Sequence, residues 1–276
     1  MLDAETEARY GPVHRVTECP GEHGGSKAFR VELKTGKTLF VKRLSARAFQ
    51  QEVAFYRDFA PRLRHVPRLL EADQEKRTLL LTEISGTSVS NQPTSAEIYK
   101  QAGSFLGSLH SLEFQDPDEM PLKVALRKRL ELFNEEAGRL LESEYLNDIN
   151  TRIKSLLSDV HLQRVPCHRD FMEYNWILRK DGTVCFFDFE HARPDYWLLD
   201  LCKMNALVWL EKPRLKEAFF RGYGYEPKAW EESLLRLWTV IWSVGTLQWA
   251  IAHGDGQYER QGRTAAKQLG ASLRPG

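Results

Sequence analysis

Short apolar runs separated by turn residues fill the first third of the chain, a pattern typical of β-strands. Five of these runs are expected to form strands: residues 13–17, 28–33, 38–44, 68–71 and 78–83. Between the third and fourth runs, Phe49, Val53 and Tyr56 recur at helical spacing and predict a helix over residues 45–59. The N-terminal part is therefore expected to be an antiparallel sheet with a single helix.

A polar segment then interrupts the apolar pattern. Residues 84–93 read ISGTSVSNQP, a composition typical of a connection between two parts of a protein. Helical spacing dominates most of the remaining chain. Seven helices are expected there: residues 95–110, 122–141, 143–157, 198–210, 214–222, 227–253 and 257–269.

One hairpin is expected inside this helical part. Residues 175–178 and 184–187 are short apolar runs joined by Lys-Asp-Gly at 180–182, a strong signal for a tight turn between two strands. We therefore predict an α+β protein with two lobes. Its parts are expected in this order: a five-stranded antiparallel N-terminal lobe at residues 1–84, a hinge at 85–94 and a mainly helical C-terminal lobe at 95–276.

The composition is that of a folded, soluble chain. Hydrophobic residues make up 42% and charged residues 28% of the 276 residues, close to the averages for globular proteins. The 39 Lys and Arg residues nearly balance the 38 Asp and Glu residues, so the chain lacks the positive field that non-specific nucleic-acid binding needs. No nucleic-acid partner is therefore expected.

Membrane insertion and export are not expected either. No run of about 18 apolar residues occurs, and the N-terminal residues lack a basic stretch followed by an apolar one. The four cysteines, at 19, 167, 185 and 202, lack the close spacing of a zinc ribbon or a redox dithiol. Free thiols in a reducing compartment are the simplest interpretation, and a cytoplasmic protein is predicted.

The densest group of polar residues lies around the predicted hairpin. His168-Arg169-Asp170 precedes the hairpin, Asn175 begins its first strand, and Asp188 follows its second strand. This order would bring two carboxylates and one amide to one edge. Phosphoryl transfer needs a group that positions or deprotonates the acceptor hydroxyl, and hard oxygen ligands for Mg²⁺; these side chains supply both.

The same residues carry a family resemblance. The segments CHRDFMEYN and FFDFEHA resemble the catalytic and metal-binding motifs of the aminoglycoside phosphotransferase and choline kinase family. The resemblance implies a protein-kinase-like fold and an enzyme that uses Mg²⁺ and ATP, with GTP left open. It also implies that Asp170 is the catalytic base, that Asn175 binds Mg²⁺ through its side-chain oxygen, and that Asp188 bridges the metal and the phosphates. The alternative is that these three side chains are ordinary polar residues of a loop.

The N-terminal lobe offers candidate contacts to the phosphates. Gly24, Gly25 and Ser26 lie between the first two predicted strands, where glycines let backbone amides approach phosphate oxygens and a serine adds a hydroxyl donor. A plain hairpin turn would have the same composition. Lys42 ends the apolar run of the third strand, where the resemblance implies a lysine on the α- and β-phosphates.

Further nucleotide contacts are expected on the following helix and strand. A lysine of this kind needs a carboxylate to orient it, and Glu52 lies beside the inward stripe of the predicted helix. A solvated glutamate on the helix surface is the alternative. Glu83 and Ile84 end the fifth strand, and the resemblance implies that their backbone groups contact the adenine ring.

Three residues near the motif are expected to be structural. The resemblance implies that His168 supports the metal-binding turn and that Asp200 braces the catalytic loop. Arg169 is most simply one half of a local ion pair, although an arginine at this position also matches protein kinases.

The acceptor pocket has no motif of its own. The resemblance implies that the helical C-terminal region forms it, and five of the seven tryptophans follow residue 205. Trp238, Trp242 and Trp249 recur at helical spacing, which favours core packing. If some of these rings face the pocket, together with acids such as Glu190 or Asp255 they would suit an amine or quaternary ammonium acceptor.

The first hypothesis is therefore an antibiotic-inactivating kinase that phosphorylates a hydroxyl of a small molecule. A choline- or ethanolamine-type kinase is the second. A non-catalytic pseudokinase is less favoured, because every position expected to be essential holds a competent residue. The sequence leaves open whether the protein is a monomer or a dimer.

Overall fold

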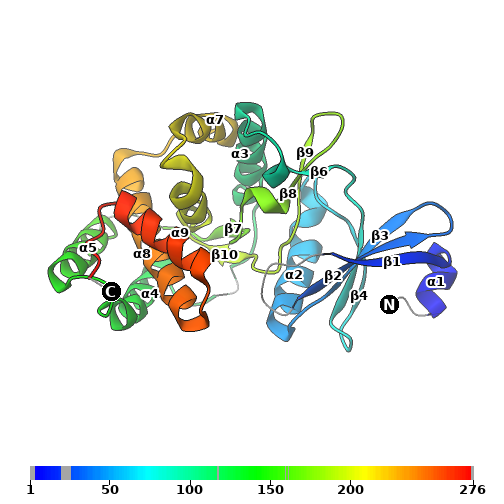
Figure 1. The fold of residues 1–276 in the computed structure, drawn as a ribbon, viewed down its shortest axis with the longest axis horizontal. Helices are drawn as coiled ribbons and strands as arrows, with labels where there is room; N and C mark the ends of the chain where they lie inside the picture. The colour runs from blue at the N-terminus through cyan, green and yellow to red at the C-terminus, as the bar shows by residue number, and fades with distance from the viewer. Residues whose placement is uncertain (1–3, 20–25, 117, 159, 161, 275–276) are drawn as a thin grey trace. The chain divides into compact units, whose positions relative to one another are not determined.

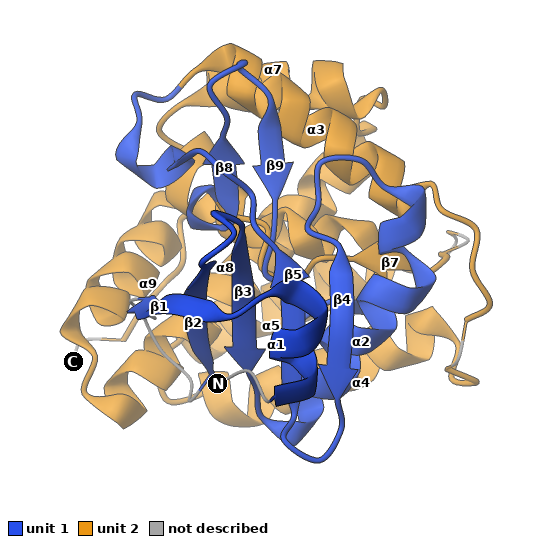
Figure 2. Ribbon diagram, turned by 90° about the vertical axis from the view of Figure 1, so that its right-hand side faces the viewer, with its two compact units in different colours: residues 1–94, 173–193 blue, residues 95–172, 194–276 orange. Residues whose placement is uncertain are grey.

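The computed structural model describes residues 4–19, 26–116, 118–158, 160 and 162–274, which fall into two units (Figures 1 and 2). Unit 1 comprises residues 1–94 and 173–193, and unit 2 comprises residues 95–172 and 194–276.

Unit 1 is built on a five-stranded antiparallel sheet with the strand order β1-β2-β3-β5-β4. Its strands are β1 (Val13–Cys19), β2 (Lys27–Leu33), β3 (Thr38–Arg43), β4 (Leu69–Asp73) and β5 (Thr78–Thr82). Its helices are α1 (Ala4–Tyr10), α2 (Ala46–Asp58) and the 3-10 helices η1 (Ala60–Arg62), η2 (Val89–Asn91) and η3 (Glu173–Asn175). All five expected strands are present, in the expected order along the chain.

The helix α1 was not expected from the sequence. It has only seven residues, too few to show a helical pattern of apolar positions. Its stability comes from contacts with β4, because Thr6 and Arg9 both donate hydrogen bonds to the Glu71 carboxylate, at 3.1 and 2.8 Å.

The two faces of the sheet differ in what they contact. Val31, Leu39 and Val41 are buried in an apolar cluster on one face. Lys42 points to the opposite face, because successive side chains of a strand alternate. There it meets α2, whose residue Glu52 accepts a hydrogen bond from the Lys42 ammonium. The alternation of β3 thus aims Lys42 at the helix.

The helix α2 has the inward stripe that its sequence predicts. The Ser45 hydroxyl caps its N-terminus by accepting a hydrogen bond from the Ala48 amide at 3.3 Å. Phe49, Val53 and Tyr56 are all buried, and Glu52 is buried among them. This helix therefore carries a carboxylate on its apolar face.

A small second sheet completes unit 1. Its strands, in spatial order, are β6 (Thr87–Ser88), β8 (Trp176–Leu178) and β9 (Val184–Phe186). The hairpin of β8 and β9 is the expected one, and its turn contains Gly182 at φ 82°. The pairing of β6 with β8 places residues 173–193 in unit 1, whereas the sequence suggested a lobe running without interruption over residues 95–276.

Unit 2 is mainly helical. Its helices are α3 (Ala96–His110), α4 (Leu122–Ala137), α5 (Ser143–Leu156), η4 (Trp197–Asp200), α6 (Cys202–Met204), η5 (Asn205–Trp209), α7 (Pro213–Tyr223), α8 (Ala229–His253) and α9 (Gly256–Gln268). Two short strands, β7 (Val165–Cys167) and β10 (Arg193–Asp195), pair with each other. β10 starts at the last residue of unit 1 and runs into unit 2.

Helices α3 and α7 approach each other closely because glycines lie at their contact. A Cβ atom on Gly103 would lie 1.9 Å from the Phe219 carbonyl oxygen, and one on Gly222 would lie 1.8 Å from the Lys100 carbonyl oxygen. No larger residue fits either position without moving a backbone. The two glycines therefore fix how α3 and α7 pack.

The helix expected over residues 198–210 is divided in the structure. A 3-10 turn at η4 and one turn of α-helix at α6 lead into η5, a π-helix in which the Leu210 amide donates to the Asn205 carbonyl. The Asn205 side chain donates to the Thr239 hydroxyl at 3.0 Å. This tertiary contact occurs at the start of the π-helix. The pattern of apolar positions along the sequence reveals neither the contact nor the π-helix.

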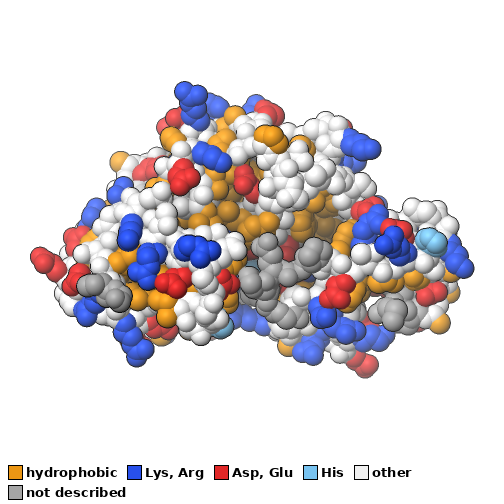
Figure 3. Space-filling view, viewed as in Figure 1, with side chains coloured by type: hydrophobic (Ala, Val, Ile, Leu, Met, Phe, Trp, Pro, Cys, Tyr) orange, Lys and Arg blue, Asp and Glu red, His pale blue; other side chains and the backbone are white. Residues whose placement is uncertain are grey.

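None of the helices in the described ranges is both long and apolar enough to cross a bilayer. The four cysteines, all in described segments, are free thiols. On the face drawn in Figure 3, Lys and Arg side chains are interspersed with Asp and Glu.

Candidate active site

Unit 1 gathers one lysine and two carboxylates. The Lys42 ammonium lies 2.7 Å from a Glu52 oxygen and 2.9 Å from an Asp188 oxygen. The side chain of Glu52 has no exposed surface, that of Lys42 is 12% exposed, and that of Asp188 is 34% exposed. The expected pairing of Lys42 with Glu52 is present, and the alternative of a solvated Glu52 is wrong.

The ionisation of this cluster follows from burial and neighbouring charge. Burial acts to lower the pKa of Lys42, but the Glu52 and Asp188 carboxylates outweigh it and raise that pKa above its usual value. Burial raises the pKa of Glu52 to about 7, although Lys42 opposes the shift. Lys42 therefore keeps its positive charge at neutral pH.

Asp188 has an uncommon backbone conformation. Its φ is 67°, in the left-handed region that non-glycine residues seldom adopt. The next residue, Phe189, is fully buried and stacks on Phe55 of α2 with ring centroids 3.7 Å apart. This stacking holds the strained turn, and strain of this kind, of order 1–3 kcal/mol, is concentrated at functional sites.

The other expected residues of unit 1 lie near this turn or outside the described segments. Asn175 is buried, and its carbonyl accepts a hydrogen bond from the amide of Phe187, the residue before Asp188, at 3.1 Å. The Ser26 hydroxyl donates to a Glu190 oxygen at 2.8 Å. Gly24 and Gly25 lie outside the described residues.

Glu83 and Ile84 follow directly after β5. The Glu83 carboxylate accepts hydrogen bonds from Arg30 and Ser85, at 3.1 and 3.2 Å, and Ile84 is half-buried. The Glu83 side chain is therefore engaged within unit 1. A contact of these residues with an adenine ring stays a prediction.

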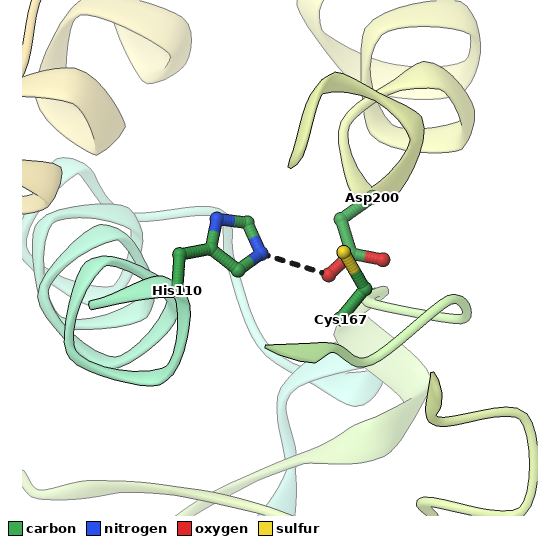
Figure 4. A group of neighbouring side chains, drawn as sticks. All are labelled: His110, Cys167 and Asp200. Atoms are coloured by element: carbon green, nitrogen blue, oxygen red, sulfur yellow. Dashed lines mark hydrogen bonds and ion pairs between the residues drawn. The ribbon is translucent and has the colours of Figure 1, made fainter. Parts of the chain in front are cut away.

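In unit 2, Asp200 holds the loop that contains the His-Arg-Asp motif. Its carboxylate accepts hydrogen bonds from the backbone amides of His168 and Arg169, at 2.8 and 2.6 Å, and from the His110 ring at 3.1 Å (Figure 4). Burial opposes its charge, but the His110 hydrogen bond and nearby positive charge outweigh that effect and lower the pKa of Asp200. The brace implied by the sequence is therefore present, with His110 as an additional member.

Arg169 forms the local ion pair expected for it, whereas support of the metal-binding turn by His168 stays a prediction. The Arg169 guanidinium is buried and forms an ion pair with Asp195 at 3.6 Å. Arg169 also has a positive φ of 70°. The His168 ring is buried and accepts a hydrogen bond from the Asp170 amide at 3.4 Å. Both residues shape the loop around Asp170.

Asp170 itself contacts a residue that the sequence did not identify. A carboxylate oxygen of Asp170 lies 2.7 Å from the ammonium of Lys203 in α6, and the two side chains are 21% and 19% exposed. The signal that would have found Lys203 is its position three residues after Asp200, about one helical turn further on.

The group of His110, Cys167 and Asp200 in Figure 4 also has the composition of a metal site, with ligand atoms within 4.8 Å of one another. The contacts of these side chains fit a structural role better than metal binding. The Asp200 oxygens already accept three hydrogen bonds. Burial raises the pKa of the Cys167 thiol well above its usual value, so the thiol keeps the proton that a metal ligand must lose.

The aromatic residues of unit 2 divide between core and surface. Trp238 is 1% exposed, as core packing predicts, whereas Trp249 is 42% exposed and stacks on His253 with ring centroids 4.4 Å apart. Asp255 caps α9 by accepting hydrogen bonds from the Gln257 and Tyr258 amides. This acid is therefore engaged within the chain.

The sequence of the chain matches a known protein family. Residues 19–238 match the phosphotransferase enzyme family, and because the match covers most of the chain, the chain belongs to that family. It is a phosphotransferase that acts on a hydroxyl of small molecules, as the motifs implied. A comparison with curated proteins found no match.

Solved structures share the fold at low sequence identity. The apo form of a thermostable mutant of the aminoglycoside phosphotransferase APH(4)-Ia is 14% identical with a TM-score of 0.69, over 95% of this chain and 96% of that chain. The ADP-bound aminoglycoside phosphotransferase APH(2'')-Ib is 17% identical with a TM-score of 0.65, over 97% and 99%. The choline kinase LicA from Streptococcus pneumoniae is 17% identical with a TM-score of 0.63, over 96% of each chain. These similarities confirm the predicted α+β, protein-kinase-like fold.

Proposed function

We propose that the protein is a kinase that uses ATP and Mg²⁺ to phosphorylate a hydroxyl of a small molecule. The observation that carries this proposal is the cluster of Lys42, Glu52 and Asp188, where a charged lysine is held by one buried and one partly exposed carboxylate. Lys42 would bind the α- and β-phosphates, and Glu52 would orient Lys42. The ADP-bound structure of APH(2'')-Ib supports nucleotide use.

The residues of unit 1 suit Mg²⁺. Asp188 has 34% of its side chain exposed, and one of its oxygens lies within 4.8 Å of ligand atoms of Glu52 and Glu190. Hard carboxylate and amide oxygens are the ligands that Mg²⁺ prefers, and Asp188 and Asn175 would hold it. When bound, Mg²⁺ offsets the negative charge of the transferred phosphoryl group.

Ser26 with Gly24 and Gly25 would contact the phosphates, and the backbone at Glu83 and Ile84 would contact the base. Ser26 already donates to Glu190, so its hydroxyl would exchange that partner for a phosphate oxygen. Whether the donor is ATP or GTP is a question for the assay below.

Asp170 would act on the acceptor. The acceptor hydroxyl donates its proton to the Asp170 carboxylate while its oxygen forms a bond to the γ-phosphorus, and the bond from that phosphorus to the β,γ-bridging oxygen breaks to release ADP. The positive φ of Arg169 and the hydrogen bonds from the loop amides to Asp200 support this role, because they fix the backbone next to Asp170.

For the acceptor, we favour an antibiotic of the kinds that aminoglycoside phosphotransferases modify. The similarity to APH(4)-Ia over nearly the whole chain supports this choice. Choline or ethanolamine is the second candidate, favoured by the similarity to the choline kinase LicA and by the exposed ring of Trp249. The engagement of Asp255 as a helix cap counts against its use as a counter-ion for a quaternary amine.

The test is an assay of ADP or GDP release from purified protein with Mg²⁺ and either ATP or GTP. Aminoglycosides, spectinomycin, macrolides, choline and ethanolamine are each added as acceptors, and Asp170→Asn protein serves as the control. We expect acceptor-stimulated release that the variant lacks. Nucleotide binding without any release would contradict the proposal and favour a pseudokinase.

A further inference from the structure

We infer that Lys203 is a positioning residue for phosphoryl transfer: its ammonium contacts the Asp170 carboxylate and so orients the group that accepts the proton of the acceptor hydroxyl. This inference rests on the proposed function, in which Asp170 acts on the acceptor. The geometry behind it is the contact of 2.7 Å between the Lys203 ammonium and the Asp170 Oδ1 atom.

The partial burial of Lys203 and Asp170 distinguishes their ion pair from ordinary surface ion pairs. Roughly four fifths of each side chain is covered, since Asp170 is 21% and Lys203 is 19% exposed. A charge-assisted hydrogen bond in such a partly desolvated place is shorter and stronger than one in water. Exposed pairs, such as Arg152 with Asp148 at 57% and 55% exposure, contribute little.

The segment that carries Lys203 is fixed on both sides. Before it, Asp200 accepts hydrogen bonds from the His168 and Arg169 amides, which directly precede Asp170. After it, Asn205 donates to the buried Thr239 hydroxyl at the start of the π-helix η5. One short segment of unit 2 therefore binds both the backbone and the carboxylate of the catalytic loop. A π-turn of this kind is often found at functional sites.

This arrangement has a consequence for the reaction. A carboxylate that the Lys203 ammonium holds at Oδ1 keeps one orientation, so the acceptor oxygen is aligned before the transfer begins. The ammonium also offsets the charge of the carboxylate while negative charge builds up on the transferred group. An ion pair that only ties α6 to the loop would stabilise the fold without affecting turnover.

The test compares Lys203→Met and Lys203→Arg with wild-type protein. Lys216→Met is the matched control, because Lys216 forms an ion pair with Glu232 at a similar side-chain exposure of 24%. The probe is ATP hydrolysis with Mg²⁺ and water as the acceptor, repeated with any acceptor found in the release assay. Turnover number, the KM for ATP and the melting temperature are measured for each protein.

We expect Lys203→Met to lower kcat by about 10- to 100-fold, the loss typical of a misplaced catalytic group. The KM for ATP should stay within about twofold, because the phosphate-binding charge is Lys42 in unit 1. Lys203→Arg should recover most of the rate, and Lys216→Met should match wild type.

Two results would overturn the inference. One is wild-type turnover in Lys203→Met protein when Asp170→Asn protein has lost it. The other is an equal loss in the Met and Arg variants together with a lowered melting temperature, which would show a structural role. Absence of ADP release from wild-type protein is a different result, because it contradicts the proposed function itself.

Discussion

Two lysine–aspartate contacts at the residues of the catalytic motifs have nearly equal lengths but very different surroundings. In unit 1, Lys42 lies 2.9 Å from Asp188 and also contacts Glu52, which has no exposed surface. In unit 2, Lys203 lies 2.7 Å from Asp170, and both side chains are about one fifth exposed. The first contact is part of a group with two carboxylates for one ammonium, whereas the second joins one ammonium to one carboxylate.

The different charges around Asp188 and Asp170 suit two different roles. A group with an excess of carboxylate oxygens and a strained, partly exposed aspartate suits a divalent cation and the phosphates bound to it. An ammonium in contact with a carboxylate can hold an aspartate in place, which suits a residue that must accept a proton from a neutral hydroxyl. The proposed roles are therefore nucleotide binding for the first group and acceptor activation for the second.

The largest expected effect on nucleotide binding comes from Lys42→Met. Turnover should fall by about 100- to 1000-fold, in line with the loss of one preorganised charge at the reacting group. The nucleotide concentration needed for half-maximal rate should rise. Lys37→Met is the control, because Lys37 is an exposed residue at the turn before β3 and should behave as wild type in steady-state kinetics.

Glu52 sharpens this prediction through a double-mutant cycle. Glu52→Gln should give a milder defect than Lys42→Met, because the cation remains but loses its buried partner. If Glu52 acts through Lys42, the double variant should be about as slow as Lys42→Met alone. Strictly additive losses would show that the two residues act independently.

A smaller effect is expected from Asp188→Asn, and it should depend on the metal. Because Asp188 would hold Mg²⁺, the variant should need about 10-fold or more Mg²⁺ for half-maximal binding of ATP, as removal of a carboxylate ligand weakens affinity for a hard cation. Titration calorimetry of ATP at several Mg²⁺ concentrations measures this shift. If the variant required the same Mg²⁺ concentration as wild type, Asp188 would not be a ligand of the metal.

Asp200→Asn tests the brace in unit 2 through stability. The pKa of Asp200 is lowered in the folded protein, so its ionised form stabilises the fold above the usual aspartate value of 3.8, and this contribution is lost as the pH falls through the lowered pKa. The variant should lose about 3 kcal/mol of unfolding free energy at neutral pH. Denaturant unfolding of both proteins should show the difference narrowing below pH 4; a difference that is constant with pH would contradict the account.

The smallest effect, confined to stability, is expected in the helices that support unit 2. Gly103→Ala places a methyl group 1.9 Å from the Phe219 carbonyl and should lower the unfolding free energy by about 2 kcal/mol or more. Gly245→Ala in α8 meets nothing within 4 Å and should change it by less than about 1 kcal/mol, towards higher stability. Thermal unfolding compares the two; equal melting temperatures would show that α3 and α7 tolerate a wider spacing.

Much of unit 1 could be predicted because its elements are local. The strands are short apolar runs between turn residues, and α2 shows its inward stripe at Phe49, Val53 and Tyr56. The division of the helix at 198–210 could not be predicted, since it coincides with the contact of Asn205 with Thr239, 34 residues away. The grouping of residues 173–193 with unit 1 likewise involves contacts between distant residues, among them the pairing of β6 with β8 and the stacking of Phe189 on Phe55.

The same difference between local patterns and contacts of distant residues applies to the candidate site. The spacing of Asp170, Asn175 and Asp188 made these residues visible because the motif is compact along the chain. Lys203 and His110 belong to other elements: Lys203 contacts Asp170 and His110 contacts Asp200 only in the folded protein. The position of Lys203 three residues after Asp200 is a signal along the sequence, whereas His110 lies 90 residues from Asp200.

The most direct test of the central assignment is a pair of measurements on Asp170→Asn protein: binding of ATP with Mg²⁺ by titration calorimetry, and turnover with an acceptor identified in the release assay. The account predicts a dissociation constant within about twofold of wild type and a turnover number lower by about 1000-fold, in the range attributed to a general base. A wild-type turnover number, or a loss of nucleotide affinity as large as that of Lys42→Met, would contradict the assignment of Asp170 to the acceptor.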